Sequence, residues 1–255
     1  MLIRHLFETR RNLNRLADIF YWPILDLALF GFISVYFQQN VGEKFNILAF
    51  FIGALIFWSV LFRVSQDITV SFLEDVWSRN LLNIAASPIT NAEYIISTIL
   101  LGLGRIILTL GIMMLLALLL YSFNIFFLGF WLALFFINLL ILGWTIGIIA
   151  MSLVLRFGQH AQFVAWTLPT LIQPFSAVFY PLSVLPEPLR AIGRALPSTY
   201  VFEGIRGVIS GGSITGANLA VAFGLNIIYL GLAVAFFSFV YKTVRKKGLI
   251  SKLTF

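Results

Sequence analysis

Long apolar runs separated by short polar stretches make up most of the chain. The longest, from Ile106 to Leu155, contains no charged residue, and only the polar positions around Ser122 and Asn124 offer a turn within it. A helix needs about 17 to 25 predominantly apolar residues to cross a bilayer. The pattern therefore predicts an all-α integral membrane fold with six spanning helices, over residues 19–37, 45–64, 94–121, 125–155, 161–184 and 217–241.

The segment before the first span, residues 1–18, combines basic and apolar positions at helical spacing. This pattern predicts an amphipathic helix that lies in the membrane interface. The arginines extend too far along the chain for a secretory signal peptide, and no small-residue cleavage site follows the apolar run. The basic positions are Arg4, Arg10, Arg11 and Arg15, and the apolar positions are Leu6, Leu13, Leu16 and Phe20.

Residues 72–86, between the second and third spans, contain no helix-breaking residue, and Pro88 follows them. Apolar positions share one helical face, and Asp75 and Arg79 are spaced to pair on the other, which predicts an amphipathic helix parallel to the membrane. Thr90 and Glu93 then have the spacing of a capping box for the third span. The helix is either a plain connector or a docking site for a soluble partner. The candidate contact residues are Phe72, Glu74, Asp75, Trp77, Arg79, Leu81 and Leu82.

Residues 185–212 are a half-polar segment punctuated by proline and glycine just before the last span. Lipid cannot hydrogen-bond irregular backbone, so this segment must lie at a membrane surface or line a cavity. Pro197 divides it into two short amphipathic helices, and a pair of glycines ends the second. Glu203 and Arg206 are spaced to pair on that second helix.

Charge sets the predicted orientation. The chain is 60% hydrophobic and 11% charged, with a net charge of +7 and no cysteine. Lys and Arg gather in the first 18 residues, in the tail 242–255 and in the loops after the second and fourth spans, whereas the opposite side has Lys44 and the segment 185–212. Because basic loops stay in the cytoplasm, both termini are expected there, and the short helices of 185–212 are expected outside, partly re-entrant. The positive charge therefore indicates membrane anchoring and not nucleic-acid binding.

Two stretches resemble a known family. The sequence ALPSTYVFEGIRGVISGG, residues 195–212, is similar to the stretch before the last helix of type-2 ATP-binding-cassette exporter permeases, although Leu196 replaces the usual Asn and Ser198 also diverges. RNLLNIAASPIT, residues 79–90, resembles the region of these permeases that couples them to their ATPase. The order of elements over the whole chain agrees with the family. The resemblance implies an external gate that includes Pro197, Thr199, Tyr200, Glu203, Arg206 and Gly207.

The resemblance also implies which partner subunits the chain needs. No G-x-x-x-x-G-K-[ST] phosphate loop occurs, so ATP and Mg²⁺ are expected on a cytosolic ATPase subunit, present in two copies. Two copies of the permease would enclose a path in the cell membrane, which is expected to be the bacterial inner membrane.

The sequence shows no metal site, bound cofactor or catalytic cluster. Expected cargoes are lipids, hydrophobic drugs or other amphipathic compounds, with a polysaccharide or lipid-linked glycan as the alternative. A secondary transporter or a membrane enzyme is less consistent with this sequence.

Four ionisable residues fall within or beside the predicted spans. A charge at bilayer depth costs about 2.5 to 3.5 kcal/mol on insertion scales, so each is expected to face protein or water. Arg63 and Asp67 are spaced to form a structural pair at the end of the second span. Asp26 either pairs with Arg105 between helices or faces the translocation path.

Aromatic residues are dense on three spans, and most are explained by packing or interfacial belts. Rings that line a path would suit amphipathic lipids, hydrophobic drugs or stacked sugars. We expect Phe57, Trp58 and Phe175 to line the path, together with Asp26. Two prolines in the fifth span are expected to kink it and to free carbonyl groups toward a cavity.

Overall fold

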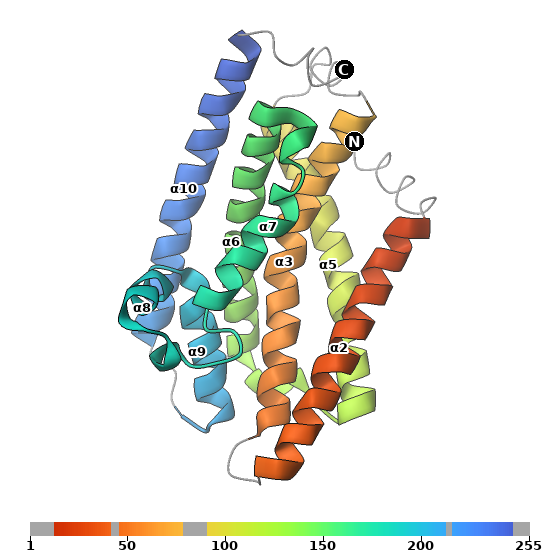
Figure 1. Ribbon diagram of the computed structural model, residues 1–255, viewed down its shortest axis with the longest axis vertical. Helices are drawn as coiled ribbons and strands as arrows, with labels where there is room; N and C mark the ends of the chain where they lie inside the picture. Colours follow the sequence, from red (N-terminus) through yellow and green to blue (C-terminus); the bar gives the residue numbers. More distant parts are fainter. Residues whose placement is uncertain (1–12, 42–45, 79–90, 213–215, 247–255) are drawn as a thin grey trace.

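The computed structural model describes residues 13–41, 46–78, 91–212 and 216–246. Every regular element within these ranges is a helix, which confirms the all-α prediction. Five long helices run side by side (Figure 1), and short helices occupy part of one side. The long helices are α2 (Leu13–Val41), α3 (Ile47–Trp77), α5 (Asn91–Tyr121), α6 (Phe130–Phe157) and α10 (Gly216–Lys246).

Four helical stretches of the described residues are long and apolar enough to cross a membrane. They lie in α3, in the Gly102–Tyr121 part of α5, in α6 and in α10. At 1.5 Å per residue, a helix of about 30 residues is roughly 45 Å long and exceeds the apolar thickness of a bilayer. The predicted first span lies inside α2, which packs against α3 and α5.

Helix α3 is the centre of the bundle and contacts α2, α5, α6, α7 and α9. Its side chains from Ile52 to Leu61 are all buried. On one side, α6 approaches it closely through Gly143 and Gly147. A Cβ atom at Gly147 would lie 2.9 Å from the carbonyl oxygen of Ser65, so only glycine permits this separation of the two helices.

Two predicted boundaries are wrong. Helix α3 does not end at Val64 but continues to Trp77, so the predicted coupling helix 72–86 has its first six residues in the last turns of α3. No proline or glycine interrupts residues 65–77, and Phe72, Leu73 and Val76 are buried in a second apolar cluster, which extends the helix. Residues 79–90 lie outside the described residues. Similarly, α2 begins at Leu13, so it includes the end of the predicted interfacial helix 1–18; residues 1–12 are not described.

The turn expected around Ser122 and Asn124, between the third and fourth spans, is present, but α6 begins later than predicted. Ser122 adopts a positive φ of 52°, and Asn124 caps a short 3₁₀ turn, η1 (Ile125–Leu128). Gly129, with φ of 55°, then starts α6, so the fourth long helix begins five residues after its predicted start at 125.

The prediction of a continuous fifth span over 161–184 is wrong. After the 3₁₀ turn η2 (Gly158–Ala161), only α7 (Val164–Ile172) is α-helical, and it is followed by η3 (Gln173–Phe175) and η4 (Leu182–Val184). Pro174 lacks the N–H that would continue the helix, and its ring opposes the carbonyl four residues earlier. Ala177 then adopts a positive φ of 53°, which takes the chain out of helical geometry. The expected kink is therefore a helix end.

The two short helices predicted within 185–212 are confirmed as α8 (Glu187–Arg194) and α9 (Pro197–Ile209). Helices α7 and α9 both pack on α3 and α6, but at different heights (Figure 1). Ile205 and Ile209 lie within about 4.0 Å of a Cβ at Gly53, in the first turns of α3, whereas α7 lies beside later turns. One side of the bundle is thus built from two short helices placed end to end, with an irregular segment between them.

Candidate functional site

The irregular backbone of residues 173–186, here called the linker segment, is held by one polar face of α9. Thr199 and Arg206 donate hydrogen bonds to the carbonyl oxygens of Phe175 (3.3 Å) and Ala177 (3.0 Å). The carboxylate of Glu203 accepts a bond of 2.6 Å from the backbone N–H of Leu182. The three α9 residues are spaced at i, i+4 and i+7, so one helix face reaches three separate points of the segment.

Arg206 makes three different kinds of contact from that face of α9. Its guanidinium forms an ion pair of 2.9 Å with Glu203, which confirms the pairing predicted from their spacing. It also lies over the ring of Phe50 in the first turn of α3, 4.7 Å from the ring centroid. The residue therefore joins the linker segment, α9 and α3 through a hydrogen bond, an ion pair and a cation–π contact.

The remaining residues of the predicted gate have local roles. Pro197 is the first residue of α9, where its missing N–H is not needed. The hydroxyl of Tyr200 donates to the carbonyl oxygen of Arg194 at 2.8 Å and so fixes the corner between α8 and α9. The carbonyl oxygen of Gly207 accepts from the N–H of Gly212 at the end of α9. Ser198, which diverges from the family pattern, is fully buried and hydrogen-bonds Ser176 at 2.8 Å.

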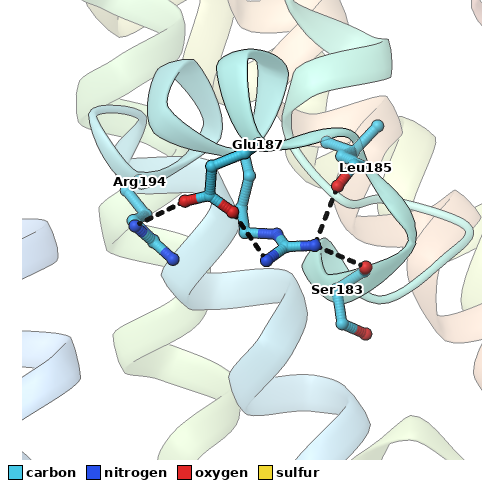
Figure 2. A network of polar contacts seen from close by, with 5 residues as sticks. Ser183, Leu185, Glu187 and Arg194 are labelled. Atoms are coloured by element: carbon cyan, nitrogen blue, oxygen red, sulfur yellow. Dashed lines mark hydrogen bonds and ion pairs between the residues drawn. The ribbon is translucent and has the colours of Figure 1, made fainter.

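Helix α8 is fixed to the linker segment by a second polar network (Figure 2). Arg190 pairs with Glu187 at 2.8 Å and donates to the carbonyl oxygens of Ser183 and Leu185 at 2.9 and 3.0 Å. Arg194 pairs with the other oxygen of Glu187 at 3.3 Å. Together with the α9 contacts, these bonds satisfy backbone groups that neither lipid nor a regular helix would satisfy.

A pocket of about 480 Å³ lies between α2, α3 and α7, next to the start of the linker segment. Its volume falls in the range of small-molecule sites. Polar side chains make up six of its eleven lining residues, an unusual proportion in so apolar a chain. The lining residues are Trp22 and Asp26 on α2; Leu55, Trp58, Ser59, Phe62, Arg63 and Gln66 on α3; and Trp166, Thr170 and Gln173 on α7 and η3.

Two of the four residues expected to line the path, Asp26 and Trp58, are on the wall of this pocket. Phe57 is not, because its side chain is 1% exposed and packs edge-on against Phe135 in the core. Phe175 lies in the linker segment, where its carbonyl oxygen accepts the bond from Thr199. The expectation that Phe57 lines a cavity is therefore wrong for this pocket.

The intramembrane charges are distributed between two sites. Arg105 on α5 forms an ion pair of 3.1 Å with Asp67 on α3, with side-chain exposures of 11% and 21%. The predicted alternative, in which Arg105 pairs with Asp26, is therefore wrong. Asp26 lies on the pocket wall together with Arg63, whose positive charge acts on it.

Sequence reasoning did not assign Gln66, Trp166, Thr170 or Gln173 to the path. The signal that was available is the i, i+4, i+7 spacing of the last three, which places one aromatic and two polar groups on a single face of a short helix.

Among the expected coupling residues, Phe72 and Asp75 are buried at the end of α3, whereas Trp77 is 45% exposed. Arg79, Leu81 and Leu82 lie outside the described residues.

Residues 4–210 match the sequence profile of a family described as ABC-2 type transporter. The chain belongs to the ABC-2 type transporter family. The match includes α3, the pocket, the linker segment, α8 and α9, so the site lies within the part that defines the family. Members of this family are transporter permease domains, which are not ATPases themselves and work with an ATP-binding partner. A comparison with curated protein sequences gives no match.

Proposed function

We propose that this ABC-2 permease is the membrane-spanning subunit of an ATP-driven exporter. Two copies of the chain form the translocation path, and two copies of a separate cytosolic subunit bind ATP with Mg²⁺ and hydrolyse it. The proposal rests on the family, on the pocket among the helices and on a direct mechanical link between that pocket and one end of the bundle.

That link is α3, and it is the observation that carries the proposal. One uninterrupted helix contains pocket residues such as Trp58 and Arg63 and ends at the exposed Trp77. The 14 residues from Arg63 to Trp77 correspond to about 21 Å of helix. A displacement of the end of α3 by a partner would therefore move the pocket wall.

The distribution of basic residues supports the end of α3 as the cytoplasmic end. Arg156 in the last turn of α6 and Arg245 and Lys246 in the last turn of α10 lie at the same end of the bundle as Trp77 (Figure 1). The hairpin at the opposite end, residues 122–129, carries no charged residue. By the positive-inside rule, this asymmetry favours an ATPase at the Trp77 end, both termini on its side and α8 and α9 toward the outside.

The runner-up is a secondary transporter, because a helix broken near its middle is a feature of that class. Membership of a family that works with an ATP-binding partner favours the ATP-driven mechanism instead. The cargo expected from the sequence is a lipid, a hydrophobic drug or another amphipathic compound, with a glycan as the alternative.

Isolation of the tagged chain from its native membrane in mild detergent tests the proposal. We expect an ATPase to co-purify in equal amounts and the complex to have the mass of two permeases and two ATPases. Hydrolysis of ATP by the complex should be abolished by a substitution in the phosphate loop of the partner. Purification without an ATPase, together with transport driven by an ion gradient alone, would contradict it.

A further inference from the structure

The residues that line the pocket follow a definite order along its length, and this order limits which ligands the pocket can bind. Because α3 runs antiparallel to α2 and α7 (Figure 1), Trp22, Trp166 and Gln66 lie toward the Trp77 end of the bundle. Trp58 and Gln173 lie toward the other end, and Asp26 and Arg63 lie between. The 11 residues from Leu55 to Gln66 span about 16 Å, so the pocket is elongated, with tryptophan and glutamine side chains at each end and Asp26 and Arg63 between them.

The polar groups in the pocket offer both hydrogen-bond donors and acceptors. Ser59 and Thr170 donate their hydroxyl protons to carbonyl oxygens of their own helices, at 2.9 and 2.7 Å, which leaves their oxygens as acceptors. The amides of Gln66 and Gln173 supply both kinds of group. A ligand rich in hydroxyl groups, each of which donates and accepts, matches this lining.

Charge and ring placement argue against two other ligand classes. The carboxylate of Asp26 is offset by Arg63, so the pocket has no excess negative charge for a lipophilic cation. A cage for a quaternary ammonium group would need all three indoles around one point, whereas Trp58 lies at the other end of the pocket from Trp22 and Trp166. An acyl chain would offer no hydrogen bond to the amides of Gln66 and Gln173, and an unmatched polar group is costly in a membrane.

We propose that this pocket binds the sugar portion of a glycan, with rings stacked on Trp58 at one end and on Trp22 and Trp166 at the other. Sugar hydroxyls bond to the side chains of Gln66, Gln173, Asp26 and Arg63. The inference rests on the proposed transport function and selects the glycan alternative over lipid or drug cargo. The sugar is either a free oligosaccharide or the headgroup of a lipid, since both present the same chemistry.

The test uses the purified permease–ATPase complex in nanodiscs of phosphatidylethanolamine and phosphatidylglycerol. The probes are maltotriose and cellotriose as free sugars, diglucosyl diacylglycerol as a lipid-borne sugar and tetraphenylphosphonium as a lipophilic cation. We expect saturable binding of at least one sugar probe and no competition by the cation. Binding of the glycolipid alone identifies a lipid-borne sugar, and binding of a trisaccharide identifies a free one.

Variants connect the binding to the pocket. Trp58→Ala and Trp166→Ala should each weaken sugar binding about tenfold or more, because each removes a stacking face. Phe163→Ala, which removes an exposed ring beside α7 that does not line the pocket, should change it less than about twofold. Gln173→Ala gives a second reading if a tryptophan variant fails to fold, and a fewfold loss is expected.

Three results would overturn the inference. They are the absence of binding for every sugar probe, saturable binding of the cation that Trp58→Ala abolishes, and sugar binding that none of the pocket variants changes. The same preparation separates this failure from failure of the proposed function. An intact, ATP-hydrolysing complex that binds no sugar contradicts only the cargo, whereas a chain that has no ATPase partner contradicts the transporter mechanism.

Discussion

The guanidinium of Arg206 donates a hydrogen bond of 3.0 Å to the carbonyl oxygen of Ala177, 29 positions earlier in the chain. Ala177 is the residue whose positive φ takes the chain away from helical geometry after α7. A side chain on α9 thus satisfies a backbone group that the break in α7 leaves without a helical partner. The shape of the linker segment depends on this bond.

Replacement of Arg206 by methionine should therefore destabilise the protein by about 1 to 3 kcal/mol, because it leaves the Ala177 carbonyl without this donor and the Glu203 carboxylate without its ion pair. Lysine at this position should recover only part of the loss, since it lacks the planar fork that reaches both groups. Thermal unfolding of the detergent-solubilised chain measures the effect. Arg194→Met, which removes a largely exposed ion pair, is the matched control and should have little effect. Equal losses for the two variants would refute this role of Arg206.

The contact between α3 and α6 should be intolerant of larger side chains. Gly147→Val would place its Cβ 2.9 Å from the Ser65 carbonyl oxygen and 3.0 Å from the Cβ of Ile68, both in the core of the bundle. We expect a fall in folded yield and in unfolding temperature, as overpacking typically costs 1 to 3 kcal/mol. Gly224→Ala on α10 is the control, because its added methyl group meets nothing within 4 Å. A Gly147→Val protein as stable as this control would show that the helices separate at little cost.

The Asp67–Arg105 ion pair should show energetic coupling between α3 and α5. Asp67→Leu and Arg105→Leu each leave a partly buried charge without this partner, so each should destabilise the fold. The double variant should be more stable than the sum of the single losses indicates, by at least about 0.5 kcal/mol. A cycle with Glu187→Gln and Arg194→Gln, at an exposed pair, should give coupling close to zero. Additive losses at Asp67 and Arg105 would mean that their contact contributes nothing to stability.

Trp77 tests the proposed connection to an ATPase. Because its side chain is 45% exposed at the end of α3, Trp77→Ala should leave the unfolding temperature almost unchanged. It should lower ATP-driven transport by the permease–ATPase complex, and the fraction of ATPase retained on the permease should fall with it. Phe130→Ala, at a side chain 74% exposed near the opposite end of the bundle, should affect neither quantity. Normal transport by the Trp77 variant would exclude this residue from the coupling surface.

Hydropathy alone located most long helices, because a run of apolar residues is a requirement of the bilayer itself. It failed at the fifth span, where the composition remains apolar but Pro174 and the positive φ of Ala177 end the helix. The spacing of Glu203 and Arg206 was enough to predict their pairing, whereas nothing in it indicated the backbone groups that they contact, the N–H of Leu182 and the carbonyl of Ala177. Such bonds depend on the path of a segment about 25 residues away, which local periodicity does not report.

Partners between helices were equally hard to predict. The depth of Arg105 made Asp26 a plausible partner, but which side of α5 faces α3 depends on packing, and Asp67 is the residue that it meets. Phe57 and Trp58 are adjacent in sequence and point to different environments, one the core and the other the pocket. Aromatic content predicted that rings would line a path without specifying which of two neighbours would do so.

The central position of α3 has a consequence for the synthesis of the protein. Its most extensive neighbour is α6, which is complete only at Phe157, about 80 residues after α3 ends. Until then, the newly made helix must keep Ser65, Asp67 and Thr69, side chains that later pack between helices, away from lipid by other means. The nascent α3 is therefore expected to stay beside the insertion machinery, or to pair early with α5 through Asp67 and Arg105, before the bundle closes around it.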